Sequence, residues 1–131
     1  KPVIEKSGQV NQHERAEYAN DEDISTKWCD NSGSNPKHIV VDLGAERTLR
    51  GWLVLHAGLE DSEFITRDFA LQVKLKQDEE WRTVDSVTGN KSLETDRTLP
   101  GEVKARYVKL NVIKGEQNLS NVARIYDFQV Y

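Results

Sequence analysis

The sequence predicts an all-β protein, a β-sandwich of antiparallel sheets, and three observations support this prediction. Apolar and polar residues alternate in most segments, clusters of turn-forming residues separate these segments, and no stretch longer than about ten residues shows clean helical periodicity. The chain has 131 residues. A chain of this length can bury one core without disulfides. We therefore expect a single domain over residues 1–131.

The expected strands follow one another along the chain. Alternation over residues 39–43, 69–76, 108–112 and 126–130 turns one face of each strand toward a core and the other toward water. Residues 52–55 form a continuous apolar run, which is typical of a more central strand. Between these segments lie turn signals, at residues 31–36, 44–46, 77–79, 89–90 and 100–101.

Composition and charge exclude several classes of protein. Asp and Glu outnumber Lys and Arg by 22 to 18, for a net charge of −4, which argues against nucleic acid and anionic membranes as partners. Mean hydropathy is −0.69, and no apolar run approaches the roughly 20 residues that span a bilayer. Cys29 is the only cysteine, so no intramolecular disulfide can form, and the three histidines lack zinc-ligand spacing. The start at Lys1 without a leader indicates an excised or processed segment.

One segment is rich in oxygen ligands. Residues 21–26 hold three carboxylates and two hydroxyls, supplied by Asp21, Glu22, Asp23, Ser25 and Thr26. A hard cation such as Ca²⁺ takes six to eight oxygen ligands from groups of this kind. The spacing is not that of an EF-hand. The alternative is a solvated acidic turn in which Asp23 or Ser25 caps a short helical turn.

Several blocks in order resemble one family. These are Asp21-x-Asp23-x-Ser25-Thr26-Lys27-Trp28, Ile39-Val40-Val41-Asp42-Leu43-Gly44, Gly51-Trp52-Leu53-Val54-Leu55-His56-Ala57-Gly58, Thr66-Arg67-Asp68-Phe69, Trp81, Gly89-Asn90 with Thr95, Ala105-Arg106-Tyr107-Val108-Lys109-Leu110 and residues 123–131. They resemble the discoidin domains, also called coagulation factor 5/8 C-type domains. The His-Ala-Gly and Thr-Arg-Asp-Phe blocks are most similar to bacterial carbohydrate-binding modules of family 32.

The resemblance implies a galactose-binding-domain-like jelly roll, five strands on three, with a structural Ca²⁺ site. By position, the implied ligands are the carbonyls of Tyr18, Asp23 and Tyr126, the side chains of Asp21 and Asp127, and Thr26 through its carbonyl and hydroxyl. Two positions depart from the family pattern. Glu22 replaces a glycine, and Asp127 replaces a longer glutamate, which favours monodentate or water-bridged ligation.

The resemblance also implies a sugar site on the loops at one end of the sandwich. His56, Arg67 and Asn90 resemble the polar triad that this family uses for galactose-type sugars. Sugar recognition joins such polar groups to an aromatic face. We expect Phe64 to supply that face, and Asp30 to add a polar contact from a neighbouring loop.

Each of these residues also has an ordinary structural interpretation. His56 can be a satisfied or exposed histidine at a strand end, and Asn90 a turn residue with positive φ. Arg67 can form a salt bridge with a nearby carboxylate, and Phe64 can be a local hydrophobic residue packed beneath a long loop. The tryptophans are expected in the core or at its edges, at Trp28, Trp52 and Trp81.

The function implied by the resemblance is that of a non-catalytic, monomeric carbohydrate-binding module. It would bind terminal galactose or N-acetylgalactosamine weakly and carry a covalently linked glycoside hydrolase to its substrate. The implied location is secreted or on the cell surface of a bacterium, without membrane insertion. One alternative is a protein- or lipid-binding discoidin domain, although such domains usually carry a bracketing pair of cysteines. The other is an enzyme, but no pair of carboxylates stands out as catalytic.

Overall fold

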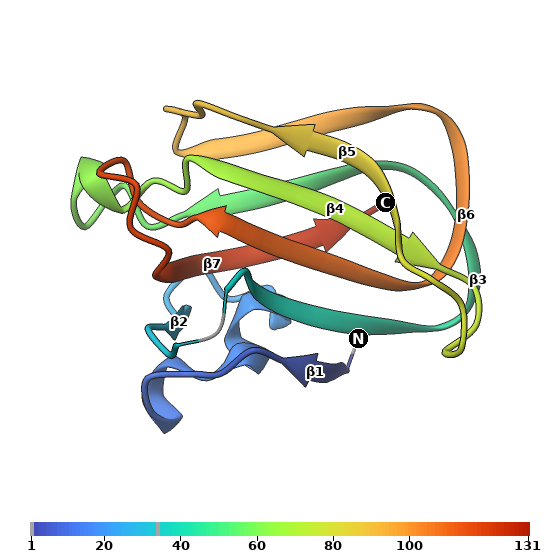
Figure 1. Ribbon diagram of the computed structural model, residues 1–131, viewed down its shortest axis with the longest axis horizontal. Helices are drawn as coiled ribbons and strands as arrows, with labels where there is room; N and C mark the ends of the chain where they lie inside the picture. Colours follow the sequence, from blue (N-terminus) through green and yellow to red (C-terminus); the bar gives the residue numbers. More distant parts are fainter. Residues whose placement is uncertain (1, 34) are drawn as a thin grey trace.

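The computed structural model describes residues 2–33 and 35–131, and its antiparallel strands form two packed layers (Figure 1). The first layer orders β1 (Val3–Lys6), the first part of β3 (Lys37–His56), the last part of β6 (Glu94–Lys114), β4 (Asp68–Lys74) and β5 (Arg82–Val87). The second contains β2 (Trp28–Asp30), β7 (Ala123–Val130) and the remaining parts of β3 and β6. The predicted all-β sandwich is confirmed, with the short β2 at the edge of its smaller layer.

Two long strands, β3 and β6, belong to both layers. They pair from Lys37 with Val112 to Asp42 with Tyr107 in the first layer, and from Gly51 with Thr98 to Leu55 with Glu94 in the second. Between these stretches the register shifts, and both strands turn back at the right-hand end of Figure 1. Gly44 and Gly101 have φ of +88° and +91° near this bend. Glycine adopts such angles without strain because it has no Cβ.

The core lies between the layers. Trp28, Trp52, Phe69 and Phe128 are fully or almost fully buried there, and Trp52 packs edge-on against Phe69 with ring centroids 5.6 Å apart. Residues 52–55 pair with both β6 and β7, so the prediction of a more central strand is confirmed. Trp81 differs from the other tryptophans because it lies half-buried on the outside of the first layer.

Helical structure is limited to three short 3₁₀ turns, η1 (Gln12–Glu14), η2 (Ala16–Asn20) and η3 (Ser62–Phe64). Among the described residues, no helix has the length and apolar character needed to cross a membrane. The loops around η3 and around residue 120 lie together at the left-hand end of Figure 1. This loop end is where a sugar site is expected.

Candidate functional site

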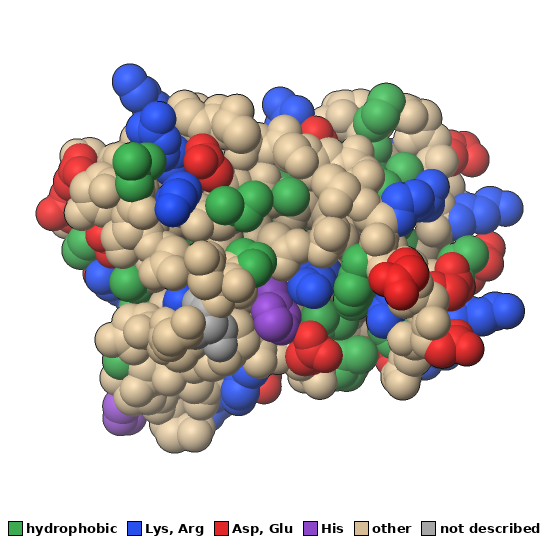
Figure 2. Space-filling view, in the orientation of Figure 1, with side chains coloured by type: hydrophobic (Ala, Val, Ile, Leu, Met, Phe, Trp, Pro, Cys, Tyr) green, Lys and Arg blue, Asp and Glu red, His purple; other side chains and the backbone are tan. Residues whose placement is uncertain are grey.

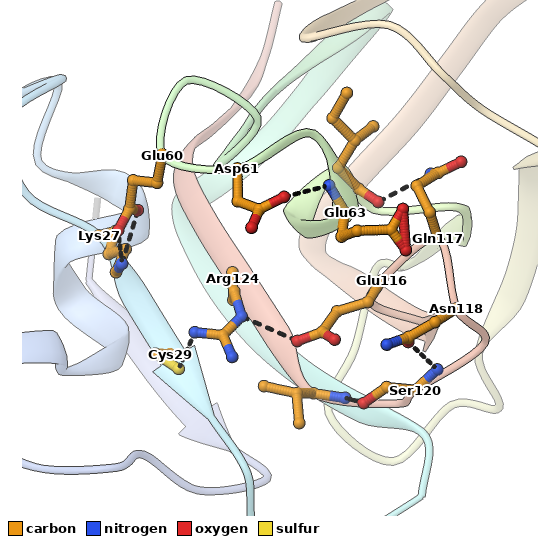
Figure 3. Close-up of polar contacts among 12 residues, drawn as sticks. Lys27, Cys29, Glu60, Asp61, Glu63, Glu116, Gln117, Asn118, Ser120 and Arg124 are labelled. Atoms are coloured by element: carbon orange, nitrogen blue, oxygen red, sulfur yellow. Dashed lines mark hydrogen bonds and ion pairs between the residues drawn. The ribbon is translucent and has the colours of Figure 1, made fainter.

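Three loops meet at the loop end of the sandwich, and Gln117 joins them. Its side-chain Nε2 donates to the carbonyls of Ile65 (2.9 Å) and Asn90 (2.8 Å), and its backbone N–H donates to the carbonyl of Glu63 (2.9 Å). Figure 3 shows Gln117 next to Glu63. The backbone N–H of Asn90 also donates to the carbonyl of Arg67. Gln117 could not be predicted from the sequence, because a single glutamine in a loop carries no motif.

His56 lies beneath these loops. Its side chain is 1% exposed, and its ring packs edge-on against Phe69 with centroids 5.1 Å apart. The expectation that this ring emerges at a loop mouth is therefore wrong. The physical reason is that residues 88–93 cover the end of β3, where the His56 N–H donates to the carbonyl of Leu93.

The hydrogen bonds of His56 define its protonation. Nε2 lies 2.8 Å from Thr95 Oγ1 and 3.3 Å from Asn90 Nδ2. Since the amide nitrogen is a donor, Nε2 accepts, and the neutral ring carries its proton on Nδ1. Burial lowers the pKa of His56 from 6.5 to about 4. Within the described chain, its Nδ1 and the Oγ1 of Thr66 are buried without a hydrogen-bond partner.

The depressed pKa of His56 gives a testable pH dependence. The native state keeps the ring neutral, whereas the unfolded chain protonates it near pH 6.5. The contribution of His56 to stability is therefore complete above about pH 6.5 and is lost as the pH falls toward 4. Urea unfolding at pH 7 and pH 4.5 should show a smaller acid loss in His56→Gln than in the wild type. Equal losses in the two proteins would contradict a buried neutral ring.

The side chains of Arg67 and Asn90 differ in what they bind. Asn90 is hydrogen-bonded within the loops, because its Nδ2 also donates to the carbonyls of Thr66 (3.0 Å) and Ser92 (3.2 Å). The positive φ belongs to Gly89, at +64°, and not to Asn90. The Arg67 side chain is 37% exposed, and its Nε lies 3.9 Å from Asp68 Oδ1. An exposed pair at that distance contributes little, so this guanidinium is available to a ligand.

The ring of Phe64 is partly covered. The guanidinium of Arg124 lies 4.0 Å from its centroid, while Arg124 Nε donates to Glu116 at 3.0 Å and one terminal nitrogen lies 3.7 Å from the Cys29 sulfur (Figure 3). A sugar can therefore stack only on the opposite face of Phe64. Arg124 was not anticipated from the sequence, because its contacts come from loops distant along the chain.

Asp30 is not part of this cluster, which corrects the sequence expectation. It is fully buried in β2. Its carboxylate accepts hydrogen bonds from the Ser7 hydroxyl and from the Ser32 backbone N–H, the latter at 2.8 Å. Ser7 of the N-terminal segment and the Ser32 backbone therefore each bind one carboxylate oxygen of Asp30, and the buried side chain does not reach the loop-end cluster.

The oxygen-rich loop gathers several of the expected metal ligands. Asp21 Oδ2 accepts from the Thr26 hydroxyl (2.5 Å), and that hydroxyl lies 3.1 Å from the carbonyl of Asp23. Asp23 Oδ1 accepts from both the N–H and the hydroxyl of Ser25, a local turn of the kind expected as the alternative. Glu22, at the family's glycine position, has φ +59°. The backbone thus keeps the left-handed conformation despite the side chain.

The last strand lies close to this loop. Asn20 Nδ2 donates to the Phe128 carbonyl at 2.8 Å. Burial raises the pKa of Asp127, and the charges of Asp21 and Glu22 raise it further. Hydrogen bonds from Gln129 and from the Phe128 backbone lower this pKa but do not offset the increase. Negative groups from both segments therefore face one another. Among the described residues, no three His, Cys, Asp or Glu side chains form a metal-binding group.

The Tyr126 side chain belongs to a separate hydrogen-bond network. The Tyr126 hydroxyl donates to Glu60 Oε2 at 2.6 Å, and Lys27 Nζ lies 2.6 Å from the same oxygen. Burial, followed by the neighbouring Glu60, raises the pKa of Tyr126 to about 12. This network joins β7 and the start of β2 to the loop that carries Phe64, as Figure 3 shows for Lys27 and Glu60. Tyr18 precedes the oxygen-rich loop in η2.

Comparisons with known proteins agree with this architecture. The family model of the F5/8 type C domain matches residues 3–126, so the chain belongs to the F5/8 type C, or discoidin, family. No curated protein matches the chain.

Solved structures of carbohydrate-binding modules share the fold. The family 32 module of Streptococcus pneumoniae EndoD is similar at 28% identity and a TM-score of 0.82, over 99% of this chain and 94% of that one. The family 32 module of Clostridium perfringens NanJ, solved with galactose, has 17% identity and a TM-score of 0.80 (96% and 90% covered). Chitosan-binding module 1 of a Paenibacillus chitosanase/glucanase has 20% identity and a TM-score of 0.78 (97% and 92% covered).

Proposed function

We propose that this chain is a non-catalytic carbohydrate-binding module that recognises terminal galactose or N-acetylgalactosamine at its loop end. The observation that carries the proposal is the partly exposed guanidinium of Arg67 beside a partly buried His56–Asn90–Gln117 hydrogen-bond network. The similarity to the EndoD module and to the galactose-bound NanJ module supports it. The module is proposed to be one domain, residues 1–131, linked to a secreted bacterial glycoside hydrolase.

The residues have different roles in this proposal. The planar fork of Arg67 donates to two adjacent hydroxyls. His56, Asn90 and Gln117 hold the loop backbones and thereby fix the position of Arg67. The open face of Phe64 covers the apolar C–H face of the ring. Because one sugar buries little area, the expected affinity is weak, in the micromolar to millimolar range.

A glycan-array screen tests which sugar is recognised. We expect binding to glycans that end in galactose or N-acetylgalactosamine, and none to glucose-terminated controls. Binding confined to other sugars would contradict the galactose assignment while retaining the class of protein. A complete lack of glycan binding would contradict the proposed function.

A second candidate, a protein- or lipid-binding discoidin domain, is favoured by one observation. Ile24 and Leu59 are 72% and 83% exposed, and with Tyr126 and His56 they line a hollow of about 160 Å³. Exposed aliphatic groups of this kind can contact a membrane or an apolar partner. Sedimentation with phosphatidylserine vesicles distinguishes the candidates, because the carbohydrate proposal expects the protein to stay in the supernatant.

We further propose that Ca²⁺ binds the oxygen-rich loop in a structural role. The carboxylates of Asp21 and Asp127, the carbonyls of Tyr18, Asp23 and Tyr126, and both oxygens of Thr26 would hold it. The ion would neutralise facing negative groups and tie the first loop to the last strand.

Removal of Ca²⁺ should therefore lower stability. A site saturated at one hundred times its Kd contributes about 2.7 kcal/mol, so a chelator should lower the Tm by several degrees. Asp127→Asn should lose this chelator effect, whereas Asp78→Asn, an exposed carboxylate in another turn, should retain it. An unchanged Tm together with no Ca²⁺ by metal analysis would contradict the site.

A further inference from the structure

A second hollow lies on the outer face of the first layer, away from the loop end. It has a volume of about 290 Å³, and its lining includes Glu5, Val40, Lys74, Trp81 and Tyr107. Strand register explains this grouping. Glu5 pairs with Val40 and Val40 with Lys109 in one row, and Lys74 pairs with Tyr107 in another. Because Val108 and Leu110 face the core, Tyr107 and Lys109 face outward.

The floor of this groove is apolar. Val40 and Tyr107 are 3% and 5% exposed although they lie on the outward face of the sheet, where an antiparallel layer usually carries polar side chains. Trp81, from the turn between β4 and β5, stands beside them, and Ile4 of β1 is exposed at the rim. Figure 2 shows this face, with green apolar side chains among blue and red ones at its lower right. The groove thus offers aromatic and aliphatic surface for the C–H face of a sugar.

Two lysines bring positive charge to this groove, Lys74 in its lining and Lys109 beside the Trp81 ring. Lys74 Nζ lies 4.4 Å and Lys109 Nζ 5.2 Å from the centre of the Trp81 ring. Neither lysine forms an ion pair within residues 2–33 and 35–131, and Lys74 donates only to the carbonyl of Gln77. Their contacts with Trp81 are cation–π interactions, which leave the ammonium N–H groups able to bind an anion.

The carboxylates nearby form no ion pair with these lysines among the described residues. Glu5 lines the groove, and its Oε2 lies 3.0 Å from His38 Nε2, a contact that is an ion pair only when His38 is protonated. Asp78, Glu79 and Glu80 in the adjacent turn are exposed, and none of them lines the groove. The groove therefore combines unpaired ammonium groups with an aromatic side chain, in a protein whose net charge is −4.

We propose that this groove is a second saccharide-binding site, and that its ligand is an acidic oligosaccharide of uronic-acid units. Ammonium groups of Lys74 and Lys109 bind the carboxylates of the sugar chain, and Trp81 packs against a ring. The site is independent of the loop end, since it shares no residue with the Arg67 network. A glycan with both neutral galactose ends and acidic segments would engage the module at two faces, which raises its overall affinity.

Trp81 provides a site-specific probe for the test. Trp28 and Trp52 are completely buried, so Trp81 is the tryptophan that solvent and ligand can reach. Titration with an oligogalacturonide should change the tryptophan fluorescence and protect it from acrylamide quenching. The double variant Lys74→Gln/Lys109→Gln should weaken this binding at least about tenfold. Lys104 is an exposed lysine of β6, the strand that also carries Lys109, so Lys104→Gln is the matched control and should not change oligogalacturonide binding.

Further measurements distinguish binding at this groove from binding at the loop end. Arg67→Ala should leave oligogalacturonide binding unchanged, and added salt should weaken binding. Trp81→Phe, with folding checked by thermal melting, should bind with reduced affinity. No response at millimolar oligogalacturonide, loss of binding in Arg67→Ala, or an equal response to polyglutamate would each overturn the proposal. These outcomes do not depend on whether the loop end binds galactose.

Discussion

Trp52→Ala should lower the free energy of unfolding by about 3–5 kcal/mol, the usual cost of emptying a large aromatic site in a core. Trp52 is completely buried between the layers, against Phe69. Its Nε1 also donates to Asp85 Oδ2 at 2.9 Å, and Asp85 is held in addition by Arg97. The loss therefore combines a cavity with a broken hydrogen bond. Urea unfolding followed by circular dichroism measures it.

Trp52→Phe separates these two effects, because it keeps most of the volume and removes the N–H. We expect it to cost about 1–2 kcal/mol beyond the change in volume. A loss below about 1 kcal/mol for Trp52→Ala would contradict a close-packed core at this position.

Gly115→Ala should impair stability and ligand binding together. A Cβ at this position would lie 1.6 Å from the Val122 carbonyl oxygen and 2.5 Å from its carbon. These are backbone atoms, so the loop itself must move, at a cost of about 3 kcal/mol. The movement would disturb the hydrogen bond from Gly115 N–H to Ser120 and the neighbouring contacts of Gln117.

Thermal melting and calorimetric titration with galactose together test this prediction. Gly33→Ala is the matched control, because a Cβ there meets no atom within 4 Å. Wild-type affinity in a destabilised Gly115→Ala would show that the 115–122 loop does not position the sugar site.

The structure separates two kinds of residue at the loop end. His56, Asn90 and Gln117 are engaged by protein groups, and they determine where the loop backbones lie. Among the described residues, the Arg67 side chain has one ion-pair partner, Asp68 at 3.9 Å, so its guanidinium can exchange water for sugar hydroxyls. Substitutions in the first group are expected to reduce stability as well as binding. Substitution of Arg67 is expected to reduce binding alone, which makes it the more informative variant.

The strands were predictable from sequence because alternation is a local property. Residues 39–43 and 108–112 show their buried faces directly, and both lie in the observed strands. The continuity of β3 and β6 was not predictable in the same way. Residues 44–46 and 100–101 have turn-forming composition, but in the structure they are bends within continuous strands. A local signal does not distinguish a turn from a bend whose flanking residues remain paired.

The candidate site was less predictable, because exposure depends on distant segments. His56 is covered by residues 88–93, and Asp30 is bound by Ser7 of the N-terminal segment. Arg124 covers Phe64 from a strand 60 residues further along the chain. Arg67, in contrast, lies partly exposed on the loop where the resemblance implied a ligand-binding role.

Calorimetric titration of galactose and glucose into the wild type and Arg67→Ala tests directly whether Arg67 recognises the sugar. We expect the wild type to bind galactose but not glucose, and Arg67→Ala to lose galactose binding with an unchanged Tm. Arg47→Ala, an exposed arginine at the bend of β3, should bind like the wild type. Undiminished galactose binding by Arg67→Ala would contradict the claim that the exposed guanidinium at the loop end recognises the sugar.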